Sequence, residues 1–149
     1  MVHVESRLEP VPVPAELIQR AALAALMQQA RDGGLTVVLS EDAHLRDLSN
    51  EYLGIDAPTD VLSFPAAETD PDSGENYLGD IVISVPRAEL QARAAGHPLS
   101  SEIQLLVVHG VLHLLGHDHD QSPSRARMWD AQARILVSIG LGEITVREK

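Results

Sequence analysis

The sequence predicts an α+β (mixed α/β) fold, with a small mixed sheet of about four strands and helices packed against it. Segments rich in β-branched residues and segments of helical periodicity both occur, but they do not alternate strictly along the chain. Of its 149 residues, 44% are hydrophobic and 22% are charged, which is typical of a globular protein with its own core. Because we find no repeat, linker or low-complexity segment, we expect residues 1–149 to form a single domain.

The first part of the chain is expected to supply two strands and two helices. Residues 2–6 alternate in polarity and predict a short edge strand. Pro14 suits the first turn of a helix, which we expect to continue to the glycine pair at 33–34. A strand follows over 35–41, where β-branched residues are frequent, and 41–54 have the periodicity of a helix that ends at its final glycine.

The middle of the chain is expected to form two further strands around an acidic loop. The segment TDVLSFP predicts a strand that Pro65 closes. Residues 66–77 are acidic and rich in turn formers, so we expect an exposed loop there. Residues 77–85 read as the next strand, and Pro86 opens a helix that runs to about Ala95.

Two more helices are expected in the last third of the sequence. The first, capped by Ser100 or Ser101, runs to Leu115 and stops at a glycine. The second begins at the Ser122 and proline pair and runs to Gly140.

Composition limits the chemistry and the partners that this chain supports. There is no cysteine, so a transition-metal site must use His, Asp or Glu. The net charge of -11 disfavours broad attraction to phosphate backbones, and we expect no DNA partner. Since the sequence has neither an apolar run of membrane-spanning length nor a leader-like N-terminus, we expect a cytoplasmic protein with no membrane partner.

The stretch HGVLHLLGHDH, residues 109–119, carries the pattern expected of a metal site. His109 and His113 are four residues apart and share one helix face, while a glycine turn brings His119 back. Three imidazoles with an open fourth position are the ligand set of a catalytic zinc site, although nickel and copper also suit imidazole. His117 is an alternative to His119, but its spacing suits the turn less well, and we interpret it as facing solvent or substrate.

The histidine stretch resembles the signature of the YbeY family of metal-dependent endoribonucleases, which are rRNA maturation factors. The segments DAPTDVLSFP (56–65) and YLGDIVIS (77–84) match the same family in the same order. The resemblance implies a fold similar to that of zinc-dependent proteases, with a central ligand helix packed across the sheet. It also implies that His109, His113 and His119 bind one Zn²⁺ ion.

By the same resemblance, the protein is expected to be a single-strand-specific endoribonuclease. Its expected roles are 16S rRNA 3′-end maturation and ribosome quality control, with rRNA, the small ribosomal subunit and its assembly factors as partners. The aromatic fraction of 3% leaves few rings for base stacking, so we expect specificity to come from a partner. Trp129 is expected to belong to the core.

One position departs from the family pattern. Where the family has an arginine ahead of PTDVLSF, this sequence has Leu53, which cannot pair with phosphate as a guanidinium does. Arg46 lies seven residues earlier on about the same helix face and is a candidate substitute facing the substrate; an ordinary solvated arginine is the alternative. Leu53 therefore keeps open a second function, a ribosome-associated assembly factor with structural zinc and weak or no nuclease activity.

The remaining candidates concern proton transfer. Asp118, Asp60 and Asp80 are candidate proton carriers, each with a structural alternative: Asp118 orienting a ligand ring, Asp60 ending a strand, and Asp80 binding backbone amides. Ser63 is a candidate to face the substrate. Another zinc hydrolase such as a peptidase is the third function considered, but Gly110 stands where the H-E-x-x-H motif has its glutamate base.

Overall fold

The fold centres on a four-stranded mixed sheet, seen in a computed structural model that describes residues 1–57, 59–118 and 121–144. Within these residues the strands are β1 (Val2–Ser6), β2 (Gly34–Ser40), β3 (Val61–Thr69) and β4 (Asn76–Ser84), in the order β1-β2-β4-β3. β1, β2 and β4 run parallel, and β3 pairs antiparallel with β4. The predicted α+β class and the edge position of residues 2–6 are thereby confirmed.

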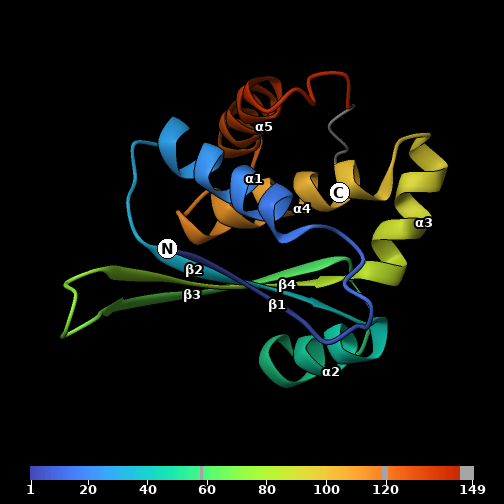
Figure 1. Cartoon of the computed structure of the whole chain (residues 1–149), viewed down its shortest axis with the longest axis horizontal. Helices are drawn as coiled ribbons and strands as arrows, with labels where there is room; N and C mark the ends of the chain where they lie inside the picture. The colour runs from blue at the N-terminus through green and yellow to red at the C-terminus, as the bar shows by residue number, and fades with distance from the viewer. Residues whose placement is uncertain (58, 119–120, 145–149) are drawn as a thin grey trace.

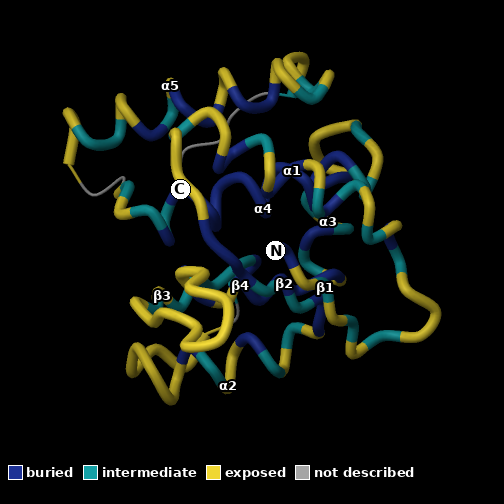
Figure 2. Tube along the Cα trace, turned by 60° about the vertical axis from the view of Figure 1, so that its left-hand side comes forward, coloured by how far each residue is buried: buried dark blue, intermediate teal, exposed yellow. Residues whose placement is uncertain are grey.

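The helices cover the two faces of the sheet unequally. They are α1 (Ala15–Gln28), α2 (Asp42–Leu53), α3 (Val85–Ala95), α4 (Leu99–Leu114) and α5 (Ser122–Ser138). Figure 1 shows α1, α4 and α5 on one face and α2 on the other. α4 is buried along most of its length, as its dark trace in Figure 2 shows, which agrees with the expected central helix. None of the helices in the described residues is long and apolar enough to cross a bilayer.

The strand β3 continues beyond Pro65, so the expectation that this proline closes it is wrong. β3 runs to Thr69 and forms a hairpin with β4, which leaves only the tip of the expected loop outside the sheet. Proline is tolerated because β3 is an edge strand and needs no backbone donor on its free side. The register also shifts between Pro65 and Glu68, an irregularity that accommodates the ring.

Two helix ends differ from the sequence-based boundaries. α1 ends at Gln28, ahead of the glycine pair, because Ala30 already adopts a left-handed φ of 53°. α4 begins at Leu99, and its N-cap is Pro98, so neither Ser100 nor Ser101 caps it. The carbonyl of Pro98 accepts the first helical hydrogen bonds, from the backbone N–H groups three and four residues later.

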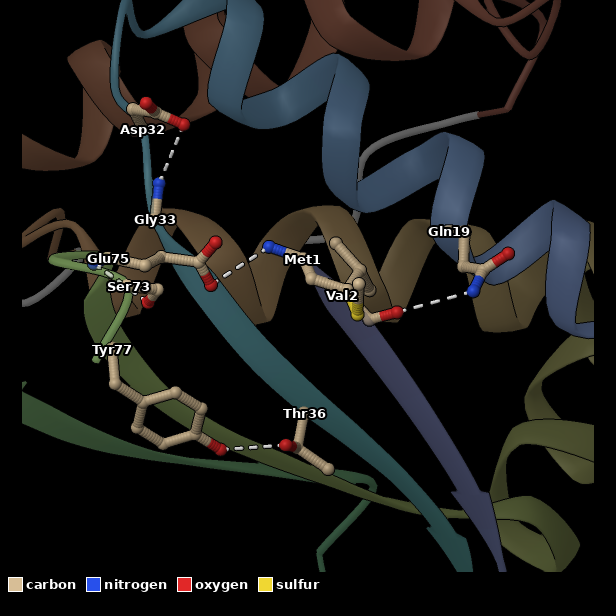
Figure 3. Close-up of polar contacts among 9 residues, drawn as sticks. All are labelled: Met1, Val2, Gln19, Asp32, Gly33, Thr36, Ser73, Glu75 and Tyr77. Carbon is tan, nitrogen blue, oxygen red and sulfur yellow. Dashed lines mark hydrogen bonds and ion pairs between the residues drawn. The ribbon is translucent and has the colours of Figure 1, made fainter. Parts of the chain in front are cut away.

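Side-chain hydrogen bonds join the hairpin and α1 to the parallel strands. In Figure 3 the Tyr77 hydroxyl of β4 and Thr36 Oγ1 of β2 are hydrogen-bonded at 2.7 Å. The Gln19 amide of α1 donates to the Val2 carbonyl of β1 at 3.2 Å. The first bond joins the two inner strands of the sheet, and the second joins α1 to the edge strand β1.

Candidate metal centre

Two histidines of the predicted metal site face each other on α4. The Nε2 atoms of His109 and His113 lie 3.1 Å apart, and the ring centroids are 4.7 Å apart. The four-residue spacing places them one turn apart on the same face. His109 is 7% exposed and His113 is half-buried, so the pair lies at the boundary between the core and the surface.

The ring of His109 is supported by a second helix. Its Nδ1 lies 3.0 Å from Oε1 of Gln132 on α5, and because an amide oxygen only accepts, Nδ1 carries the proton and donates. The ring also lies 5.8 Å from that of Trp129, centroid to centroid. Sequence reasoning missed Gln132 and placed Trp129 only in the core. Their three-residue spacing on one helix face was the available signal.

The two imidazoles fit a divalent metal. With Nδ1 protonated, Nε2 of His109 keeps its lone pair and points towards Nε2 of His113. Two imidazole nitrogens bound to one tetrahedral zinc at about 2.0–2.1 Å lie about 3.3–3.4 Å apart, close to the separation found here. The third predicted ligand, His119, lies outside the described residues, so its role stays a prediction.

The turn after α4 has the predicted conformation. Gly116 has a φ of 96°, in the left-handed region that an L side chain rarely adopts. The backbone N–H of His117 donates to the Leu112 carbonyl at 2.9 Å, which closes the helix end and reverses the chain.

A cleft of about 460 Å³ opens beside the histidine pair. Its walls come from α4, the edge strand β3 and the segment ahead of β3. The cleft is lined by Leu53, Thr59, Asp60, Val61, Leu62, Ser63, Pro65, His109 and His113. The structure thus brings Asp60 and Ser63 together with the two described histidines, and Leu53 lies at the same cleft.

Asp60 and Ser63 are held differently. Asp60 is 6% exposed, and Thr59 Oγ1 lies 3.5 Å from its Oδ1. The hydroxyl of Ser63 donates to the Gly110 carbonyl at 3.1 Å, which joins β3 to α4 one residue after His109. Ser63 therefore links the cleft's two walls in addition to lining it.

Two other predicted residues lie away from the cleft lining. Asp80 and Ile81 are neighbours in β4, so their side chains project from opposite faces of the sheet. The Ile81 side chain meets Gly110 of α4. The Asp80 carboxylate lies on the other face and hydrogen-bonds with the Tyr77 hydroxyl. Arg46 of α2 forms an ion pair with Asp56 at 2.7 Å, and both side chains are exposed. The structure does not bring either residue to the histidines.

His117 and Asp118 follow the turn. The His117 ring reaches Gln29 near the end of α1, with 2.6 Å between Nε2 and Oε1. Burial, aided by Arg127, lowers the pKa of His117 below its usual range and so favours the neutral ring. Asp118 is exposed.

Comparison with known proteins identifies the family. The model of the family "Endoribonuclease YbeY" matches residues 10–140. An endoribonuclease YbeY of Moorella thermoacetica is 43% identical over 142 residues, covering 87% of this chain and 91% of the relative. Another, from Gloeobacter violaceus, is 47% identical over 119 residues and covers 77% and 61% of the two chains. A Thermotoga maritima protein of known solution structure has the same fold, with a TM-score of 0.58, 21% identity, and coverage of 100% and 99%. The chain belongs to the endoribonuclease YbeY family.

Proposed function

We propose that this protein is a zinc-dependent, single-strand-specific endoribonuclease that acts in 16S rRNA 3′-end maturation and ribosome quality control. The observation that carries the proposal is the facing Nε2 pair of His109 and His113 at the cleft, with Nδ1 of His109 3.0 Å from Oε1 of Gln132. Family membership supports RNA as the substrate, because the relatives are named endoribonucleases. The proposed partners are rRNA, the small ribosomal subunit and its assembly factors, in the cytoplasm.

The residues proposed to hold the ion are His109, His113 and His119. Three neutral imidazoles leave the ion its full charge and an open position, as in catalytic zinc sites. When bound, zinc supplies a Lewis acid that polarises a phosphoryl oxygen and makes water acidic enough to act near neutral pH. Its charge also offers a phosphodiester an attractive point in a chain of net charge -11.

The carboxylate best placed for proton transfer is Asp60. It lines the cleft together with the two histidines, and its burial favours exchange of a proton with the substrate over exchange with bulk water. We propose that Asp60 takes the proton of the attacking hydroxyl, from water or from the 2′ position of RNA. Asp118, close to His119 in sequence, is proposed to orient a ligand ring.

The proposal is tested with protein purified without an affinity tag. Metal analysis is expected to find one zinc ion per chain, and an RNA strand is expected to be cut when unpaired but not when annealed to its complement. Activity that elutes apart from the protein on two different columns, or equal cutting of strand and duplex, would contradict the proposal.

Leu53 favours a second candidate function, an assembly factor with structural zinc and weak or no nuclease activity. Leu53 is 58% exposed and lines the cleft, where an arginine would be a phosphate clamp. The described residues that line the cleft include no arginine or lysine. Neutralisation of phosphate there therefore falls to the ion or to a partner.

Substituting Leu53→Arg is expected to raise kcat/KM for single-stranded RNA about tenfold at low salt. A charge-assisted hydrogen bond to phosphate contributes about 1.5 kcal/mol or more, equivalent to that factor. The matched control is Leu90→Arg, which adds the same charge at an exposed leucine of α3. Wild type without cleavage beside an active Leu53→Arg variant would favour the assembly-factor function; equal gains in both variants would indicate a general charge effect.

A further inference from the structure

We propose that Gln132 is a positioning residue that holds His109 in the tautomer able to bind a divalent cation. Gln132 is 2% exposed and comes from α5, and its Oε1 accepts from Nδ1 of His109 at 3.0 Å. The inference rests on the proposed metal centre but concerns a residue beyond the ligand set. The inference gives a role to the Gln132 amide, which lies in the largely apolar contact between α4 and α5.

The physical reason lies in the two tautomers of a neutral imidazole. One ring nitrogen carries the proton and the other the lone pair, and only the lone pair binds a metal. With the amide oriented as in this contact, an Nδ1 without its proton would set its lone pair against that of the Gln132 oxygen in a buried setting. Gln132 therefore favours Nδ1–H and leaves the Nε2 lone pair of His109 directed at His113.

The plane of the ring is fixed by the same helix. Trp129 lies three residues before Gln132 on α5, and its ring is tilted 34° to that of His109. The His113 ring meets His109 edge-on from α4. Contacts from α5 and α4 together limit rotation of the imidazole, so the direction of the Nε2 lone pair is set before any ion arrives.

The neutrality of the amide has a consequence for the bound ion. A carboxylate in this position would fix the same tautomer, but it would also add negative charge beside the ion and make the ligand ring more basic. An amide fixes the ring while leaving more of the cation's charge for a phosphodiester. This matters in a chain whose net charge is already -11.

The experiment compares three variants of the full chain. Gln132→Met removes the acceptor at nearly constant size, and Gln132→Glu keeps it. Gln104→Met is the matched control: Gln104 is also buried, but it bonds Arg20 and the Ser100 carbonyl and does not line the cleft. Circular dichroism and amide NMR spectra establish that each variant is folded. Nitrogen NMR of metal-free protein identifies the protonated nitrogen of His109, and competition with a chromophoric chelator gives the zinc affinity.

The expected result separates positioning from general stability. Wild type, Gln132→Glu and Gln104→Met keep Nδ1–H, whereas Gln132→Met gains the Nε2–H form. Zinc affinity falls about 10- to 100-fold in Gln132→Met alone, the loss typical of a missing partner to a ligand ring. The inference is overturned if Gln132→Met keeps both tautomer and affinity, or if Gln104→Met loses affinity equally. Wild type that binds no zinc would instead overturn the metal centre, and with it the metal-binding part of this inference.

Discussion

Cleavage of single-stranded RNA is expected to fall at least about a hundredfold in His113→Ala, because the several kcal/mol that a bound metal contributes to the transition state are lost. His113 is the better choice of the two described histidines, since His109 is more buried and also packs against α5. Initial rates on a labelled unstructured RNA, with zinc content determined on the same samples, give both activity and metal loss. A chelator added to wild type is expected to reproduce the loss, and zinc to reverse it.

The matched control for this prediction is His3→Ala. His3 is an exposed residue of the edge strand β1, and its replacement also removes an imidazole from the surface. Its cleavage rate and zinc content are expected to equal those of wild type. Undiminished cleavage in His113→Ala would mean that the measured activity comes from another nuclease in the sample.

Gly110→Ala is expected to lower the free energy of unfolding by about 1–2 kcal/mol. A Cβ at this position would lie 2.8 Å from Cγ2 of Ile81, with two more Ile81 carbons at 3.1 and 3.2 Å. Ile81 is fully buried and β-branched, so it cannot swing away, and overpacking of this kind costs about 1–3 kcal/mol. The better helix propensity of alanine offsets at most about 1 kcal/mol of that cost.

Urea unfolding of Gly110→Ala measures this effect, and a double-mutant cycle with Ile81→Ala assigns it. Ile81→Ala removes the obstructing carbons. The loss of unfolding free energy in the double variant is therefore expected to be smaller than the sum of the losses in the two single variants. Additive losses would show that α4 does not meet β4 at this point. The same close approach explains the absent glutamate of the H-E-x-x-H motif, because a side chain at position 110 would enter the sheet core and not the cleft.

Local sequence signals were sufficient for most of the fold. Proline, glycine and β-branched residues influence the backbone within a few positions. The succession of strands and helices along the chain, and the glycine turn at Gly116, could therefore be predicted from the sequence. The extent of β3 did not, because the effect of Pro65 depends on whether its strand lies at the sheet edge. That position is set by pairing between distant segments and not by the segment itself.

The candidate site was predictable only where its residues are close in sequence. His109 and His113 share a helix, and the helical period alone predicts that they face each other. Gln132 comes 23 residues after His109, and only the packing of α5 against α4 brings them together. Asp80 shows the opposite case: it adjoins a core strand residue, but strand alternation turns it to the other face of the sheet.

The burial of α4 has a consequence for the way the centre responds to its surroundings. Backbone amides in the most enclosed element of a protein exchange with solvent only when most of the molecule opens. Residues 105–112 are therefore expected to be among the slowest positions in a deuterium-uptake experiment. An ion held by this helix would stabilise the native state as a whole, so the thermal midpoint is expected to rise with free zinc concentration. Entry and escape of the ion are then expected to depend on the cleft wall formed by β3 and the segment ahead of it, while the wall formed by α4 stays fixed.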